Sequence, residues 1–145
     1  MTVTELTIQI PNQPGDLAKV SQLLGDAGAN LIAILVSTTT PDGSGLVRFV
    51  SDNPEKAKNI LTTQGFEVKT REVIAADTPH HAGGLQAILK PLHRRRVNID
   101  CIYPCTSRGK NTVLILGIET TFLGDAISAL KENWIHLFGE ELYHM

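Results

Sequence analysis

The sequence predicts an α+β protein made of two tandem copies of one small domain. The first observation is length, because 145 residues suit two domains of about 70 residues each. The second is apolar periodicity, which alternates between the strand and helix repeats in the same order twice. The third is a recurrence of residues at an offset of 68 positions, a spacing that indicates duplicated domains. The recurring pairs are Gly15 and Gly83, Leu17 and Leu85, Val20 and Ile88, Leu24 and Leu92, and Asn30 and Asn98.

The first copy opens with a strand that ends at Ile10, where apolar residues alternate with polar ones. Residues 11–16 (Pro-Asn-Gln-Pro-Gly-Asp) favour a turn. Apolar residues then return at helical spacing over 17–27, and Gly28 can take the left-handed conformation that ends a helix. The apolar run over 31–38 predicts the second strand.

A hairpin, a helix and a strand complete this copy. Residues 41–45 predict the hairpin turn and residues 46–50 the returning strand. The Asp-Asn-Pro sequence at 52–54 predicts a helix start, with a capping side chain and a proline at the first helical position. Gly65 is expected to end this helix, and residues 66–68 to begin a fourth strand. The order β-α-β-β-α-β is the ferredoxin-like plan, an antiparallel sheet with two helices on one face.

The second copy repeats this order, so the predicted domains are residues 1–71 and residues 72–145. Pro91 lies inside its first helix and should kink or shorten that helix. The predicted elements are a strand at 73–76, a loop at 77–84, a helix at 85–92, a strand at 98–103, a turn at 107–111, a strand at 113–118, a helix from Thr120 or Thr121, and a short closing strand at 141–144.

Composition and charge argue against several functions. Hydrophobic residues make up 42% of the chain, and no segment approaches the roughly 18 uninterrupted apolar residues of a membrane span. With 13 Lys and Arg against 15 Asp and Glu, the sequence has no basic footprint for nucleic acid. The N-terminus lacks the pattern of a secretory signal, and two cysteines do not make a disulfide scaffold. We therefore expect a cytoplasmic protein with reduced thiols.

Catalytic motifs are absent from the sequence, which contains no nucleophile elbow, phosphate-binding loop or H-E-x-x-H. RNA-binding proteins of the ferredoxin-like plan need aromatic residues on their central strands, but 46–50 and 113–117 together hold one Phe. We therefore predict no enzymatic activity, no cofactor and no RNA binding.

The loop before the first predicted helix is the candidate ligand site. A helix start presents unpaired backbone amides, and the helix dipole there favours negative charge, so this loop suits a small carboxylate. Asn12 lies in this loop, and Asp16 stands where an acidic residue would cap or complement the exposed amides of the first helical turn. Asn12 and Asn30 also have a simpler interpretation, since asparagine is common in turns.

The sequence resembles the ACT domain, a small amino-acid-sensing module. The resemblance covers essentially the whole chain and implies a stand-alone pair of ACT domains with no attached catalytic domain. The matching residues are Asn12-Gln13-Pro14-Gly15-Asp16-Leu17 and Gly28-Ala29-Asn30-Leu31-Ile32 in the first copy and, more loosely, Ala82-Gly83-Gly84-Leu85 and Val97-Asn98-Ile99 in the second.

ACT domains usually bind free amino acids between two copies, so the resemblance implies a ligand site at the interface of the two domains. The second loop has His80-His81-Ala82 where the first has Asn12-Gln13-Pro14, so the two sites need not bind the same ligand. A small subunit that docks on a separate metabolic enzyme, with ligand binding lost, is the alternative. The implied ligand contacts are Asn12, Pro14, Gly15, Asp16, Leu17, Asn30, His80, Gly83, Gly84, Leu85 and Asn98.

Ligand binding would bias the packing of the domains or the association of chains. Exposed edge strands invite pairing between chains, so we expect a homodimer.

Three histidines, His93 among them, and two cysteines raise the alternative of a metal site, and with it a metal-dependent enzyme at His80 and His81. His80 and His81 are adjacent loop residues, and Cys101 and Cys105 do not have the spacing of a zinc hairpin, so no metal site is predicted. The cysteines are more simply packing residues of a sheet. The histidines are more simply polar loop residues, either of which could make a pH-responsive contact with a ligand.

Cationic and aromatic residues near the helix ends have structural interpretations. Arg94–Arg96 complement the negative end of a helix dipole, and an anionic partner for them is the alternative. Trp134 and Phe138 are spaced four apart and are predicted to lie in the core or in an interface.

Overall fold

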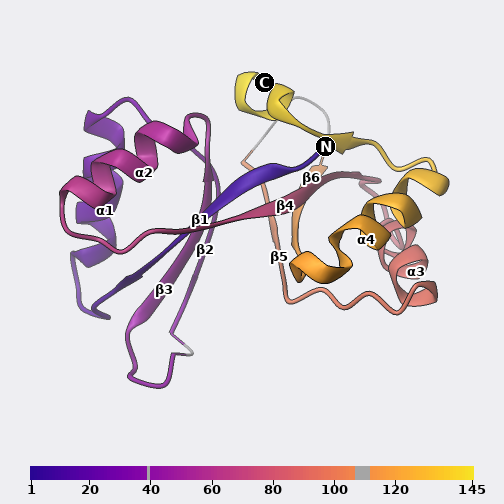
Figure 1. Ribbon diagram of the computed structural model, residues 1–145, viewed down its shortest axis with the longest axis horizontal. Coiled ribbons are helices and arrows are strands. Elements are labelled where there is room, and N and C mark those ends of the chain that lie inside the picture. Colours follow the sequence, from indigo (N-terminus) through magenta and orange to yellow (C-terminus); the bar gives the residue numbers. More distant parts are fainter. Residues whose placement is uncertain (39, 107–111) are drawn as a thin grey trace. The chain divides into compact units, whose positions relative to one another are not determined.

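The computed structural model describes residues 1–38, 40–106 and 112–145, so the turn predicted at 107–111 lies outside the described residues (Figure 1). The chain divides into two compact units. Thr4–Arg71 form the N-terminal unit, whereas Glu72–Met145 together with Met1–Val3 form the C-terminal unit.

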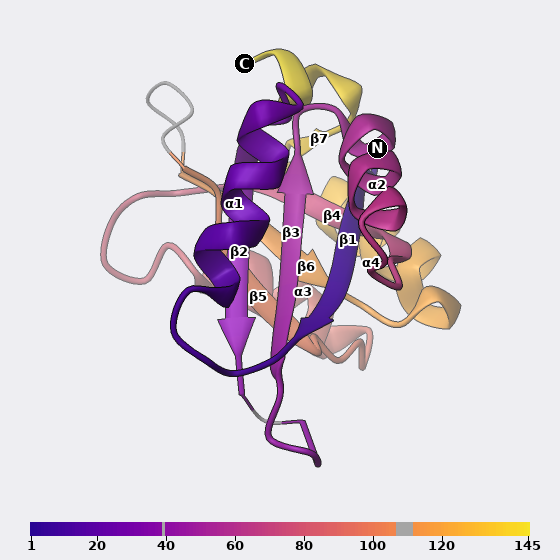
Figure 2. The same ribbon diagram turned by 90° about the vertical axis from the view of Figure 1, so that its left-hand side faces the viewer.

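The N-terminal unit is a sheet covered by two helices. Strand β3 pairs antiparallel with both β1 and β2, and α1 and α2 lie on the same face of these strands (Figure 2). Its core lies between the helices and this face and includes Leu6, Leu24, Phe49 and Leu61. The elements are β1 (Val3–Ile10), α1 (Asp16–Asp26), β2 (Leu31–Ser37), β3 (Gly45–Ser51), α2 (Pro54–Thr63) and the start of β4 (Lys69–Thr78).

The C-terminal unit repeats this arrangement. Strand β6 pairs antiparallel with β4 and β5, and β7 pairs with β4. Residues of α3 and α4 cover a core that includes Ile74, Ile88, Leu116 and Leu130. The predicted tandem ferredoxin-like fold is therefore confirmed. The further elements are α3 (Gln86–Arg94), β5 (Cys101–Pro104), β6 (Thr112–Gly117), α4 (Thr120–Glu132), β7 (Leu137–Phe138) and a 3-10 helix at Glu140–His144.

Two predicted strands are wrong in position. Residues 66–68 are not a strand, and β4 runs without interruption from Lys69 to Thr78, because no glycine or proline breaks the chain there. The closing strand predicted at 141–144 is a 3-10 helix, in which the amide of Leu142 donates to the carbonyl of Gly139 at 3.0 Å. The edge of β4 is instead paired with the buried residues of β7.

The two units differ in the residues that follow their helices. In the N-terminal unit the residues that follow the C-caps of α1 and α2 are Gly28 (φ 77°) and Gly65 (φ 92°), as predicted. The same positions after α3 and α4 hold Arg96 (φ 56°) and Trp134 (φ 63°), which are the two non-glycine residues with positive φ in the described chain. A left-handed conformation costs such residues about 1–2 kcal/mol each.

Other sequence predictions about the helices and aromatic residues have mixed outcomes. The Asn53 side chain caps α2 by accepting from the Lys56 amide at 3.2 Å, as predicted. Pro91 does lie within α3, which has nine residues against eleven in α1, so the helix is short but not interrupted. Trp134 and Phe138 do not share a helix, since α4 ends at Glu132; Phe138 is buried, but Trp134 is 95% exposed and is no core residue.

A buried carboxylate joins three strands of the N-terminal unit. The side chain of Glu5 on β1 is fully buried and lies 2.8 Å from Nε of Arg71 on β4 and 3.5 Å from Nη1 of Arg48 on β3. A buried carboxylate is stable only when it is paired in this way. The sequence pattern gives Glu5 no special role, because it occupies an ordinary position in an alternating strand.

The β2–β3 hairpin is held by the carboxylate of Asp42. It accepts hydrogen bonds from the Ser44 hydroxyl at 2.6 Å, the Ser44 amide at 3.0 Å and the Gln9 side-chain amide at 3.2 Å. Hydrogen bonds from the Ser44 hydroxyl, the Ser44 amide and the Thr40 hydroxyl hold the pKa of Asp42 below its ordinary value of 3.8. The stability that these hydrogen bonds give to the folded state is therefore fully present above pH 3.8, and it is lost as the pH falls through the lowered pKa of Asp42.

Glu5→Gln should lower the free energy of unfolding by about 2–3 kcal/mol, because it removes the charge of a buried carboxylate that pairs with Arg71 and Arg48. Urea denaturation followed by circular dichroism measures the change. The matched control is Glu132→Gln, which removes an exposed ion pair with Arg95 at 2.7 Å and should cost less than about 1 kcal/mol. Equal losses of unfolding free energy in the two variants would contradict a stabilising role for the buried ion pair of Glu5.

Ser44→Ala should raise the pKa of Asp42 toward 3.8, since it removes the hydroxyl that lowers that pKa most. A carbon-detected NMR titration of the side-chain carboxyl gives the value directly. Ser128→Ala, an exposed change on α4, should leave it unaltered. An Asp42 pKa that is the same with and without the Ser44 hydroxyl would show that the network is not formed in solution.

Candidate functional site

The loop between β1 and α1 carries most of the predicted contacts of the first copy. Asn12, Pro14 and Gly15 are exposed, and Gly15 is the N-cap of α1 with φ 92°, a conformation that favours glycine. No side chain caps this helix end. One carboxylate oxygen of Asp16, Oδ2, is buried without a hydrogen-bond partner among the described atoms. The loop therefore offers both uncapped helix amides and an unused acceptor.

The corresponding loop of the second copy is closed on itself. The amide of Gly84 donates to the carbonyl of His81 at 2.9 Å, and the amides of Gln86 and Ala87 donate to loop carbonyls at 3.1 Å. A Cβ atom on Gly84 would lie 2.0 Å from the carbonyl oxygen of Pro79, so this position requires glycine. Gly84 is therefore explained by the close approach of two backbone segments, and its amide is not available to a ligand.

The predicted contacts do not form one cluster within a unit. Asn30 follows α1, whereas Asn12 and Gly15 precede it, and eleven helical residues span about 16 Å. The Asn30 amide donates to Oδ1 of Asp52 at 2.8 Å, and its carbonyl accepts from the Asp52 amide at 3.0 Å. Each unit thus has two separate groups of predicted residues, one at each end of its first helix.

Both units contain a hollow beside the proline that follows the first strand. In the N-terminal unit this strand-end hollow has a volume of about 430 Å³ and lies beside Pro11. In the C-terminal unit it has about 340 Å³ and lies beside Pro79. The N-terminal hollow is lined mainly by Thr7, Gln9, Asp42, Ser44, Glu67 and Lys69, and the C-terminal one by Asp77, Thr78, His80, Thr112, Trp134 and His136.

The two strand-end hollows occupy equivalent places in the duplicated fold. Gln9 and Pro11 correspond to Asp77 and Pro79 at the offset of 68 residues. Each hollow is completed by the start of the third strand of the unit and by the residues that follow its second helix. Of the predicted residues, His80 alone lines either hollow. Extending the repeat upstream of Gly15 matches Pro11 with Pro79, the two prolines beside the hollows.

The side chains of the two hollows differ in charge. The lining of the N-terminal hollow includes two acidic residues, Asp42 and Glu67, and one basic residue, Lys69. The C-terminal hollow combines one carboxylate, Asp77, with two imidazoles and the exposed ring of Trp134. Of the two hollows, the N-terminal one is lined by a lysine as well as by carboxylate side chains, whereas the C-terminal one is lined by no lysine or arginine.

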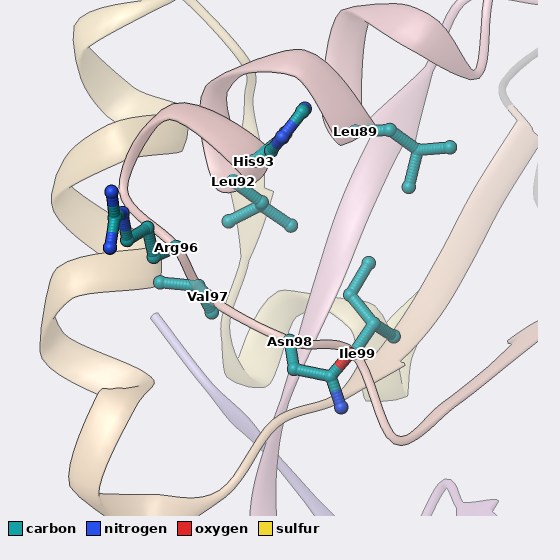
Figure 3. Close-up of a pocket in the computed structure, with 7 residues that line it drawn as sticks. All are labelled: Leu89, Leu92, His93, Arg96, Val97, Asn98 and Ile99. Atoms are coloured by element: carbon teal, nitrogen blue, oxygen red, sulfur yellow. The ribbon is translucent and has the colours of Figure 1, made fainter.

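A third hollow, of about 510 Å³, lies where α3 ends and β5 approaches (Figure 3). Leu89, Leu92 and Ile99 give it an apolar wall, and the predicted contact Asn98 lies at one end. The guanidinium of Arg96 and the side-chain amide of Asn98 point away from each other in Figure 3. The polar groups of this hollow therefore do not converge on one ligand position.

The described residues contain no group of three or more His, Cys, Asp and Glu side chains that could hold a metal ion. Cys101 and Cys105 are not joined by a disulfide. In the same part of the chain, no helix is both long and apolar enough to cross a membrane.

Comparisons with known proteins place the chain in a family. The solved structure of protein BT0572 from Bacteroides thetaiotaomicron is 25% identical, with a TM-score of 0.86, covering 100% of this chain and 98% of that one. The ligand-free regulatory subunit of aspartate kinase from Thermus thermophilus is 19% identical, with a TM-score of 0.62 and coverage of 90% and 91%. The Thermus flavus regulatory subunit is 17% identical, with a TM-score of 0.60 and coverage of 90% and 92%.

The two aspartate kinase subunits are too distant in sequence to show more than a shared fold. No curated protein sequence matches this chain. The family model of the ACT domain pair matches residues 1–136. This match confirms the resemblance seen in the sequence, and the chain belongs to the family of ACT domain pairs.

Proposed function

We propose that this chain is a non-catalytic regulatory protein that binds a free amino acid. Membership of the ACT domain pair family supports a regulatory role, and the regulatory subunits of aspartate kinase share its fold. The observation that carries the ligand assignment is the N-terminal strand-end hollow, where Lys69 lies with Asp42 and Glu67.

An amino acid carries an ammonium group and a carboxylate, so its site needs charges of both signs. Lys69 supplies a cation for the carboxylate, and Asp42 and Glu67 supply anions for the ammonium group. The lowered pKa of Asp42 keeps this carboxylate ionised throughout the neutral range. The adjacent loop adds the uncapped amides of α1 and the unpartnered oxygen of Asp16.

The ligand site is assigned to the N-terminal unit rather than to both units. The C-terminal hollow lacks a lysine or arginine. In the C-terminal loop the amides of Gly84, Gln86 and Ala87 donate to loop carbonyls, whereas in the N-terminal loop the amide of Asp16 does so. A ligand that binds one conformation of the N-terminal unit more tightly than another would shift the population toward it, which is the physical requirement for regulation.

A subunit that docks on a separate enzyme without binding a ligand is the second candidate. The exposed Trp134 favours it, because tryptophan is enriched among the residues that dominate protein–protein binding energies. This candidate predicts that no free amino acid changes the stability of the protein.

One amino acid of the common set should raise the melting temperature in a thermal-shift screen, since a ligand at a hundred times its Kd stabilises the folded state by about 2.7 kcal/mol. Lys69→Met should abolish the shift by removing the cation of the hollow. Lys58→Met, an exposed change on α2, should leave it intact. A screen in which every amino acid leaves the melting temperature unchanged favours the docking subunit.

Calorimetric titration of the Asn12→Ala variant distinguishes a ligand bound on the β1–α1 loop from one bound in the strand-end hollow. If the ligand sits in the strand-end hollow, Asn12→Ala should raise the Kd by less than about threefold, whereas Lys69→Met should raise it by at least about tenfold, corresponding to 1.4 kcal/mol. The reverse order of the two effects would place the ligand on the loop and the α1 start instead.

A further inference from the structure

The end of α3 carries the densest cluster of cationic side chains in the sequence. Lys90 and the three arginines 94–96 are four of the thirteen Lys and Arg residues of the chain, and His93 lies among them. All five of these residues are exposed. No acidic residue occurs between Asp77 and Asp100, so the helix brings no carboxylate of its own to the cluster.

Part of this charge is neutralised within the C-terminal unit. The guanidinium of Arg95 donates to the carboxylate of Glu132 on α4 at 2.7 Å. The side chains of Arg94 and Arg96 make no hydrogen bond or ion pair with any residue that the structure describes. Two guanidinium groups are therefore available to an anion that the described chain does not supply.

The duplicated fold does not require this charge. The last turn of α1 contains no basic residue, and the positions equivalent to Arg94 and Arg96 are Asp26 and Gly28. Both α1 and α3 nevertheless end in the same way, with a residue of left-handed backbone conformation after the C-cap. A favourable interaction with the helix dipole therefore does not by itself account for three adjacent cations, which also repel one another.

An apolar recess lies directly beside the arginines. It is the hollow of about 510 Å³ at the end of α3, and Figure 3 shows Arg96 on the side opposite Leu89 and Ile99. Leu92 is buried beneath it, and Leu89 and Ile99 are half-buried, so none of these apolar side chains protrudes from the surface. The apolar wall is therefore reached by a side chain that projects into the hollow and not by a flat surface.

The chemistry of this region favours an acidic polypeptide over other polyanions. Single-stranded nucleic acid needs aromatic rings on which its bases stack, and the lining of the hollow contains no Phe, Tyr or Trp. An anionic membrane needs apolar side chains that insert into the lipid, whereas those of the hollow are recessed. A polypeptide can place one apolar side chain in the hollow and its carboxylates on the guanidinium groups nearby.

We propose that the α3-end surface, formed by Arg94, Arg96 and the hollow beside them, binds an acidic segment of another protein. The segment inserts a large apolar side chain against Leu89 and Ile99 and pairs its carboxylates with the two arginines, whose planar groups can each donate two parallel hydrogen bonds. This surface shares no residue with the N-terminal strand-end hollow, so the proposal does not depend on amino-acid binding.

Selection of short random peptides on the immobilised full chain, followed by fluorescence anisotropy of the enriched peptides, tests the proposal. The enriched sequences should combine Asp or Glu with a large apolar residue, and added salt should weaken their binding. Arg94→Gln with Arg96→Gly should raise the Kd by at least about tenfold. Glycine suits the left-handed conformation at position 96, so the fold is retained. Lys19→Gln with Lys58→Gln removes the same charge from exposed positions and should leave the Kd nearly unchanged.

The apolar half of the surface is tested by Leu89→Ser, which introduces the residue type of the equivalent Ser21. This variant should also raise the Kd by about tenfold, because it removes part of the apolar wall. Circular dichroism confirms that each variant is folded.

Three results would overturn the proposal. The first is a selection that enriches no acidic sequences, and the second is equal binding of the peptides to wild type and to Arg94→Gln with Arg96→Gly. The third is arginine-dependent binding of a single-stranded oligonucleotide, of phosphatidylserine vesicles or of a second copy of the chain, without peptide binding, which would assign the surface to that partner instead.

Discussion

The strand-to-helix reversal at the start of each unit is the constraint from which the other features follow. Both helices of a unit must cover one face of its sheet, so the chain must leave β1 or β4 and turn back within a few residues. Glycines with φ 92° and 79°, Gly15 and Gly83, occur at this reversal. Antiparallel pairing of the first and third strands places the end of the first strand beside the start of the third, and the strand-end hollow lies at this place in both units.

Duplication has repeated the hollow but not its chemistry. The same backbone arrangement carries Lys69 with two carboxylates in one unit and two histidines with Trp134 in the other. The helix ends diverge similarly, since Gly28 and Gly65 are matched by Arg96 and Trp134 in the same left-handed conformation. The N-terminal unit is thus suited to a zwitterion, and the C-terminal unit presents a different surface.

Much of the fold follows from local signals in the sequence. Asn53 and Pro54 start α2, and apolar periodicity locates the helices, because each depends on neighbouring residues alone. The position of β7 depends on its pairing with the edge of β4. This pairing joins residues that are far apart in the sequence, so no local pattern predicts it or the continuity of β4. The burial of Glu5 likewise depends on Arg48 and Arg71, which are distant along the chain.

The contacts that the family resemblance implies, on either side of the first helix, remain a prediction. Within one unit, a helix of eleven residues separates Asn30 from Asn12. The proposed hollow joins Gln9, Asp42 and Lys69 from three separate segments, which no local pattern in the sequence brings together. Sequence spacing could not show that Gly84 closes the second loop, since the contact with the Pro79 carbonyl exists only in three dimensions.

Amide NMR of the isotope-labelled chain, titrated with free amino acids, tests the central claim that a zwitterion binds in the N-terminal strand-end hollow. The hollow predicts that the largest shifts fall on Gln9, Ser44 and Lys69, with the end of α3 around Asn98 unaffected. Shifts centred on the α3 end, or a spectrum that no amino acid changes, would contradict it.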